Sequence, residues 1–331
     1  MSPVTVLVFI AGALASLAAS VVLVTRLERL GQRLAAPEAV LGLVTALAAD
    51  APEISAALAA IAHGQRDLGV GVVLGSNVFN LAMLLGLSAL VAGRIALHRK
   101  VVIFEGLVAL WVAVMAVAAV ARIIPPGPSL ALTLVVFAPY LVLSALPPAR
   151  RRRLPLPAPW RAWLASAVNE EELELLAAIH PRRGRWTDGV TALVALAVVV
   201  AASTAMERSA SALGVRWGVS AIVVGGVVLA AVTSLPNAVA AVYLASRGRA
   251  SATLSEALNS NALNAIVGLM IPAVVLHVSR AGAGGLVSAA WYAALTALTL
   301  ALAYAARGLG RRSGALIVAA YVVFVVVLLL L

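Results

Sequence analysis

The sequence contains no cysteine, and charged residues make up only 11% of it. The lack of cysteine excludes disulfide scaffolds and thiol chemistry. The small charged share, with 63% hydrophobic residues and a mean hydropathy of +1.07, excludes a soluble globular domain, whose apolar fraction is about 45 to 50%. Only four histidines are present, and no two of them have the spacing of metal ligands. This composition is that of a protein that crosses a membrane several times.

Ten apolar stretches are long enough to form helices that cross a bilayer core, which takes roughly 20 residues. They cover residues 3–25, 37–62, 69–92, 101–121, 129–146, 187–206, 219–245, 252–277, 284–306 and 314–331. The sequence therefore predicts an all-α membrane protein with ten transmembrane helices.

Lysine and arginine are distributed unevenly among the loops between these stretches. The first stretch has neither residue before it and is followed by Arg26, Arg29 and Arg33. With the N-terminus outside, 19 of the 24 Lys and Arg residues fall in cytoplasmic loops, where such residues concentrate. We therefore expect a multi-pass protein of the cell (plasma) membrane with both termini outside. The formal charge of +11 is then a topology signal in a chain that lies in the lipid bilayer, and no nucleic-acid partner is expected.

The segment 147–186 is basic and rich in proline. We expect it to be a cytoplasmic loop between two membrane regions, residues 1–146 and 187–331. Residues 160–179 predict a short helix on or near the membrane, and they include an acidic run from Glu170 to Glu174. The loop is either a solvated connector with an interfacial helix or an element that senses cations through this acidic run.

Two carboxylates lie inside the second apolar stretch, in the tetrapeptide Asp50-Ala51-Pro52-Glu53. A charged side chain at the centre of a membrane helix costs roughly 2.5 to 3.5 kcal/mol on insertion scales. Acids retained at this cost usually belong to an ion or proton path. The third stretch carries a second polar motif, residues 75–80 with the sequence Gly-Ser-Asn-Val-Phe-Asn.

The same pattern returns 184 residues later, in Thr233-Ser234-Leu235-Pro236-Asn237 and in residues 260–264 with the sequence Ser-Asn-Ala-Leu-Asn. The offset superimposes Pro52 on Pro236, and it superimposes the two Ser-Asn-x-x-Asn motifs on each other. Four polar or proline positions in register across two apolar segments indicate an internal duplication.

Each copy belongs to a set of five predicted spans, an odd number, so the second set enters the membrane from the opposite side. The sequence thus predicts two inverted five-helix repeats, in which the substrate site lies near the midplane where discontinuous helices meet. Pro52 and Pro236 are expected to interrupt their helices, and to deprive the carbonyls of Ala48 and Val232 of helical partners. Such carbonyls are hard oxygen ligands suited to Na+ or Ca2+.

Asp50 and Glu53 are three residues apart and share one face of a helix. If this face points inward, the pair can bind a divalent cation, and a proton can compete for the same oxygens. Asp50 could instead cap the water-exposed end of the helix. The neutral candidates share faces in the same way: Ser76 with Asn80, Ser260 with Asn264, and Ser234 with Asn237 at the positions of Asp50 and Glu53.

Two of these interpretations have alternatives. The Ser-Asn pairs could serve only as hydrogen-bonding contacts between helices, although their duplication favours cation ligands. Glu256, four residues before Ser260, could be a third acid of the site or could lie at the cytoplasmic mouth near Arg247 and Arg249.

These motifs resemble those of the calcium/cation antiporter superfamily, which includes sodium/calcium exchangers and cation/proton exchangers. The family has inverted repeats, each with a Thr-Ser-x-Pro-Glu type segment followed by a Gly-Ser-Asn-x-x-Asn/Asp type segment. The resemblance implies that Glu53 is the principal acid of the first repeat. It implies polar ligands at Ser76, Asn80, Ser234 and Ser260, and carbonyl ligands at Ala49 and Thr233.

The chain departs from the family pattern at three positions. Asn237 occupies the acid position of the second repeat, Asn264 occupies a position where some members have Asp, and Asp50 replaces the usual Ser of the first repeat. Both acids therefore come from one half.

The resemblance and the buried acids together predict a secondary-active antiporter that exchanges Ca2+ or a related cation for Na+ or H+ by alternating access. The inorganic cations are substrates, and no cofactor is expected. The alternatives are a monovalent cation/proton antiporter, with Asp50 and Glu53 as proton carriers, and a degenerate membrane scaffold that does not transport. A membrane-embedded enzyme is disfavoured because the sequence has no His-Glu-x-x-His or Gly-x-Ser-x-Gly motif.

Overall fold

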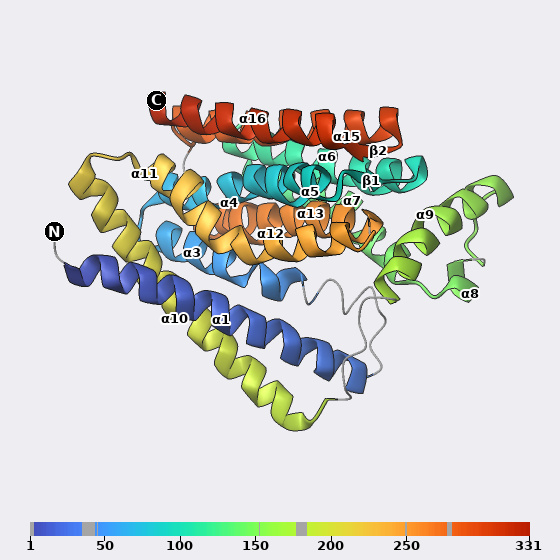
Figure 1. Ribbon diagram of the computed structural model, residues 1–331, viewed down its shortest axis with the longest axis horizontal. Coiled ribbons are helices and arrows are strands. Elements are labelled where there is room, and N and C mark those ends of the chain that lie inside the picture. Colours follow the sequence, from blue (N-terminus) through green and yellow to red (C-terminus); the bar gives the residue numbers. More distant parts are fainter. Residues whose placement is uncertain are drawn as a thin grey trace.

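The computed structural model describes residues 3–34, 44, 46–151, 153–176, 184–248, 250–276 and 280–331. Within these residues the protein is a bundle of helices, most of which run along one common direction (Figure 1). Nine of them are long and apolar enough to cross a membrane. The predicted class, an all-helical multi-pass membrane protein, is confirmed.

Five of the nine spans are single helices or nearly so: α1 (Pro3–Arg33), α6 (Arg99–Val120), α7 (Pro126–Ala145), α10 (Trp186–Trp217) and α15 (Ala283–Ala306). A sixth, α16 (Arg311–Leu330), ends the chain's helices. Each of the other three spans contains a segment of π-helix. The first consists of α4 (Arg66–Asn80), η1 (Leu81–Leu87) and α5 (Ser88–Ala92). The second consists of α11 (Ala221–Val223), η2 (Val224–Leu229) and α12 (Ala230–Ser246), and the third of α13 (Ala250–Leu263), η3 (Asn264–Met270) and α14 (Ile271–Val275).

The second predicted span, residues 37–62, is described only in part. Its second half is the short apolar helix α3 (Ala51–Ala62), which follows helical residues 46–49. Residues 37–43 and 45 lie outside the described residues, so the count of ten transmembrane helices stays a prediction.

Two short strands join loops that lie far apart in the sequence. Strand β1 (Arg94–Ala96) pairs antiparallel with β2 (Gly308–Gly310), with Ile95 opposite Leu309. This small sheet is a departure from the predicted all-α class. It connects the loop before α6 to the loop before α16, both of which are cytoplasmic in the predicted topology.

The central connector lies at one end of the bundle, and both chain termini lie toward the other end (Figure 1). It contains α8 (Pro148–Arg151) and α9 (Ala158–Leu176), which confirms the expected short helix near residues 160–179. Helix α9 is held against α6 by an edge contact of Trp163 with Phe104 and by a hydrogen bond from Lys100 to Ser166. The side chains of the acidic run from Glu170 to Glu174 lie outside the described part, so its role is not tested.

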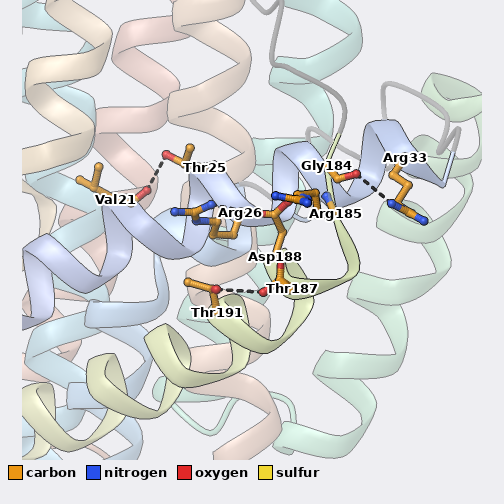
Figure 2. A network of polar contacts seen from close by, with 9 residues as sticks. All are labelled: Val21, Thr25, Arg26, Arg33, Gly184, Arg185, Thr187, Asp188 and Thr191. Atoms are coloured by element: carbon orange, nitrogen blue, oxygen red, sulfur yellow. Dashed lines mark hydrogen bonds and ion pairs between the residues drawn. The ribbon is translucent and has the colours of Figure 1, made fainter.

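Helices α1 and α10 lie side by side along one edge of the bundle (Figure 1). Small residues allow this contact, because a Cβ on Gly12 would lie 2.9 Å from the carbonyl oxygen of Ala202. Figure 2 shows the polar end of this pair, where Arg26 forms an ion pair of 2.7 Å with Asp188 and Arg33 donates to the carbonyl of Gly184. The two helices correspond to the first span of each predicted half.

The centre of the bundle is the long span Arg66–Ala92, which is almost entirely buried. It approaches the other half very closely at Gly75, where an added Cβ would overlap the carbonyl oxygen of Gly226 in η2. Only glycine permits such a close contact between two helix backbones in a membrane bundle. This contact brings the motifs of the two halves together.

Pro52 and Pro236 differ in their effect on the helices that contain them. Helix α3 begins at Ala51 with Pro52 in its first turn, directly after a bend at Asp50, so the predicted interruption is present. Helix α12 runs through Pro236 without a break, so the predicted interruption there is wrong. Helices in a bundle tolerate proline when local adjustments satisfy the backbone, and here a π-helical segment, η2, lies directly before α12.

Two of the π-helical segments, η1 and η3, begin at nearly corresponding positions of the two halves, about 184 residues apart. Segment η1 begins directly after Asn80, and η3 begins at Asn264. The last residue of each Ser-Asn-x-x-Asn motif therefore lies where the helix widens. π-Helical segments of this kind are frequent at functional sites.

Candidate cation site

Both acids of the tetrapeptide are buried where the two halves meet. The side chain of Glu53 accepts a hydrogen bond of 2.9 Å at Oε1 from the hydroxyl of Ser234. Asp50 accepts at Oδ1 from the amide of Asn237 (2.9 Å) and from the hydroxyl of Ser260 (2.7 Å). Asp50 makes no side-chain capping bond to α3 and is 0% exposed, so the alternative of a water-exposed cap is wrong.

Each carboxylate uses only one oxygen in these bonds. Within the described residues, Oδ2 of Asp50 and Oε2 of Glu53 have no hydrogen-bond partner, and the same holds for Oγ of Ser76 and Oδ1 of Asn264. All four side chains are completely buried. A buried polar atom without a partner costs about 1 to 3 kcal/mol, and more when it is charged. Such oxygens are suited to a hard cation such as Ca2+ or Na+.

Asn80 links this cluster to a network of amides. Its Nδ2 donates to Oγ of Ser260 (3.2 Å) and to Oδ1 of Asn261 (3.0 Å). Asn77 and Asn261 then bond each other reciprocally, each Nδ2 donating over 3.0 Å to the other residue's carbonyl oxygen. A continuous path of hydrogen bonds therefore runs from this asparagine pair through Asn80 and Ser260 to Asp50.

The sequence interpretation did not assign a site role to Asn77 or Asn261. The signal was present, because these two residues superimpose on each other at the 184-residue offset. Their pairing across the interface between the halves required the tertiary structure.

The predicted backbone ligands have other surroundings. The hydroxyl of Ser20 in α1 donates to the carbonyl of Ala48 (3.2 Å) and, at 3.5 Å, to that of Ala49. Ser20 thus compensates for the hydrogen bond that Pro52 removes. The hydroxyl of Thr233 donates to the carbonyl of Leu229 in its own helix, and a ligand role for the Thr233 carbonyl stays a prediction.

Glu256 lies on α13, one helical turn before Ser260. Its Oε2 is buried and has no hydrogen-bond partner among the described residues. Arg247, one of the basic residues proposed as its neighbours, lies over the ring of Tyr243. This placement favours the interpretation of Glu256 as an acid near the site.

The site is poor in charged ligands. Among the residues described here, no group of three or more His, Cys, Asp or Glu side chains could hold a metal ion. A cation in this cluster therefore needs neutral hydroxyl and amide oxygens in addition to the two carboxylates. Oxygen ligands of this kind suit hard cations such as Ca2+, whereas Zn2+ and Cu+ prefer nitrogen and sulfur ligands.

Buried acids between two sets of membrane helices, surrounded by hydroxyl and amide groups, define a protein of the cation-transport class. The family model described as sodium/calcium exchanger protein matches residues 4–146 and 189–330. The chain belongs to this family. The prediction that it is a secondary transporter and not an enzyme is thereby confirmed.

Two relatives extend this similarity. The inner membrane protein YrbG of Escherichia coli (strain K12) is 28% identical over 72% of this chain and 70% of its own length. The putative antiporter CaxA of Alkalimonas amylolytica is 26% identical over 86% of this chain and 85% of its own.

Solved structures share the fold. The H+/Ca2+ exchanger CAX superimposes with a TM-score of 0.69 at 15% identity, over 98% of this chain and 86% of that one. The sodium-calcium exchanger NCX_Mj, soaked with Na+ and Sr2+, superimposes with a TM-score of 0.61 at 20% identity, over 98% and 99% of the two chains. At these identities the likeness shows a common fold.

Proposed function

We propose that this protein exchanges Ca2+, or a related cation, for Na+ or H+ by alternating access around Asp50 and Glu53. The observation that carries the proposal is the arrangement of the two acids. Both come from one half and both are hydrogen-bonded by the other half, and within the described part of the chain each keeps one carboxylate oxygen without a partner.

The proposed ligands are predicted site oxygens that lack a hydrogen-bond partner among the described residues, on Asp50, Glu53, Ser76, Asn80 and Asn264. Two carboxylates neutralise a divalent cation, and the hydroxyl and amide oxygens add neutral ligands to a shell that for Ca2+ holds about 6 to 8 oxygens. Three further predicted residues hold the two carboxylates by hydrogen bonds: Ser234, Asn237 and Ser260. Ligand roles for the carbonyls of Ala49 and Thr233 stay part of the proposal. Because Asn237 stands where the family has an acid, Asp50 restores the charge from the first half.

Exchange requires that occupancy controls movement. The unbound carboxylates repel each other and carry buried charge, whereas a bound cation or protons would neutralise them. States that differ in bound charge therefore differ in how readily the site can be exposed to one side or the other. Protons and cations compete for the same oxygens, which would couple their movements in opposite directions.

The proposed architecture is a pair of inverted repeats, residues 1–146 and 187–331, with ten transmembrane helices. The reciprocal bonds between Asn77 and Asn261 and the matching positions of η1 and η3 support it. We place α9 on the cytoplasmic side of the cell membrane because most Lys and Arg residues lie toward that end in the predicted topology. Both termini then lie outside.

Ion flux in proteoliposomes tests this function. Uptake of 45Ca2+ is expected when a Na+ gradient or a pH gradient is imposed, and the gradient that works identifies the counter-ion. Glu53→Gln should abolish this uptake. Glu207→Gln is the matched control, because Glu207 is also completely buried but lies on α10 beside His63. Uptake of 45Ca2+ by this variant should stay within about threefold of wild type, which corresponds to a small free-energy change.

Monovalent cation/proton exchange is the second candidate. The second half offers the neutral Asn237 and Asn264 where acids occur in the family, and two carboxylates suffice to carry protons. In that case the wild type would exchange Na+ for H+ without Ca2+ uptake. A chain that exchanges no cation under either gradient would instead be a non-transporting scaffold, and the proposal would be wrong.

A further inference from the structure

The pair formed by Asn77 on α4 and Asn261 on α13 relates the two halves by a local twofold symmetry. The two residues are 184 positions apart, and each donates its Nδ2 to the other's backbone oxygen over 3.0 Å. A carbonyl can only accept, so these bonds fix the orientation of both amides. Each Oδ1 therefore points away from the reciprocal bonds and is available to accept a hydrogen bond.

The surroundings of the pair do not follow this symmetry. On one side, Asn80 donates to Ser260 Oγ and to Asn261 Oδ1. The matching donor on the other side is Asn264, and its matching acceptors are Ser76 Oγ and Asn77 Oδ1. None of these matching atoms has a hydrogen-bond partner among the described residues, although all three side chains are completely buried.

One neighbour lies close to the open side. The hydroxyl of Tyr292 on α15 is beside the Asn77 amide. Among the described residues, neither the Tyr292 hydroxyl nor Asn77 Oδ1 has a hydrogen-bond partner of ordinary geometry. Tyr292 is also buried. The open side therefore contains several polar atoms that remain unsatisfied in the arrangement seen here.

We propose that Asn77 and Asn261 form a two-position switch: Asn80 donates to Asn261 in this arrangement, and Asn264 donates to Asn77 in the arrangement open to the other side of the membrane. The inference rests on the proposed alternating access. In transporters built from inverted repeats, one repeat moves against the other around the central site when access changes sides. The switch exchanges one amide hydrogen bond for an equivalent one during that movement.

The switch also ties access to ligand geometry. In the present arrangement Ser260 Oγ accepts from Asn80 and donates to Asp50, whereas Ser76 Oγ has no hydrogen-bond partner among the described residues. In the other arrangement Asn264 donates to Ser76 Oγ, and Ser260 Oγ is released from Asn80. Asn77 and Asn261 are thus positioning residues that determine which half offers its serine hydroxyl to the cation.

The experiment compares Asn261→Ala with Asn77→Ala. Each substitution removes one of the two reciprocal bonds, and Asn261→Ala also removes the acceptor of Asn80. A purely structural role predicts a loss of stability in both variants without opposite changes in the side from which the site is reached. The switch predicts opposite effects. Asn261→Ala removes the acceptor that stabilises the arrangement seen here, and Asn77→Ala removes the acceptor that stabilises the alternative.

Chemical labelling measures the balance without knowledge of the transported ion. A charged, membrane-impermeant carbodiimide is added to right-side-out and to inside-out vesicles, and mass spectrometry gives the modification of Asp50 and Glu53 from each side. Asp67 is exposed near one end of the bundle and is the internal control for vesicle orientation. The ratio of outside to inside modification should change about three- to tenfold in one variant and by a similar factor in the opposite direction in the other, as expected for one hydrogen bond.

Both variants should lower the melting temperature, and Asn261→Ala should lower it more because it also loses the bond from Asn80. If either fails to fold, Asn261→Ser and Asn77→Ser provide the same comparison with smaller changes in packing. Shifts in the same direction, or unchanged ratios in folded variants, would overturn the switch. Absence of cation exchange by the wild type, with opposite labelling shifts in the variants, would overturn the proposed function alone.

Discussion

The two halves of the molecule contribute different chemistry to the same buried cluster. The first half supplies both carboxylates, on Asp50 and Glu53, while the second half supplies the neutral donors Ser234, Asn237 and Ser260 that bond them. A repeated pair of motifs thus forms one asymmetric site. The comparison suggests a rule that can be tested: the charge could lie in either half, provided that the helices bring both halves to one place.

Moving the acid across the interface is the sharpest test of this comparison, and it should have the largest effect. Asp50→Asn should weaken cation binding about 100-fold, since a carboxylate in contact with a divalent ion contributes several kcal/mol even at an effective dielectric constant of about 20. Asn237→Asp added to it should recover most of the loss, because the two side chains are 2.9 Å apart. Isothermal titration with Ca2+ and Na+ measures both, with Asp67→Asn as the exposed control. No recovery in the double variant would show that the halves are not interchangeable.

The second test concerns the close packing of the two halves at Gly75. Gly75→Ala should destabilise the protein by about 2 to 3 kcal/mol, because the new methyl group would overlap the carbonyl of Gly226. Gly127→Ala in α7 meets nothing within 4 Å and should leave the stability unchanged or slightly raised. Thermal unfolding in detergent compares the two variants. Equal melting temperatures would contradict the close packing of the halves at Gly75.

The hydroxyl donors of the second half should differ in importance. Ser234→Ala removes the donor to Glu53 from the other half, whereas Asp50 keeps Asn237 after Ser260→Ala. We expect about tenfold weaker cation binding for Ser234→Ala and about threefold for Ser260→Ala, within the range for hydrogen bonds to charged groups. The same titrations would reveal a reversed order, which would mean that Asp50 and its partners dominate the site.

Removal of the ion pair between α1 and α10, at the edge of the bundle, should have the smallest effect on stability. Arg26→Met breaks the ion pair with Asp188, but the Arg26 side chain is 34% exposed. Partly exposed pairs contribute about 1 kcal/mol or less and are screened by salt. The loss of stability, measured by thermal unfolding, should shrink further between 0.1 and about 1 M salt. A loss as large as that of Gly75→Ala would show that the edge pair is as important as the central contact.

The membrane class and the main residues of the buried polar cluster were predictable from local patterns, whereas their role as cation ligands stays a prediction. Hydropathy and the cost of charge in lipid act on each segment separately, so they identified most spans and marked Asp50 and Glu53 as exceptional. The 184-residue register then selected Ser76, Asn80, Ser260 and Asn264. The different behaviour of Pro52 and Pro236 was not predictable, because it depends on whether the neighbouring backbone can adjust.

The sequence by itself determined that this chain lies in a membrane, carries a duplicated polar motif and has two acids inside an apolar stretch, where a charged side chain costs free energy. These properties depend on composition and spacing along the chain. Only the tertiary structure decided which donors meet which acids, that Ser20 bonds the carbonyl freed by Pro52, and that Asn77 and Asn261 bond each other. Those contacts join residues far apart in the chain, and they depend on how closely two helix backbones approach and on which face each turns toward the other.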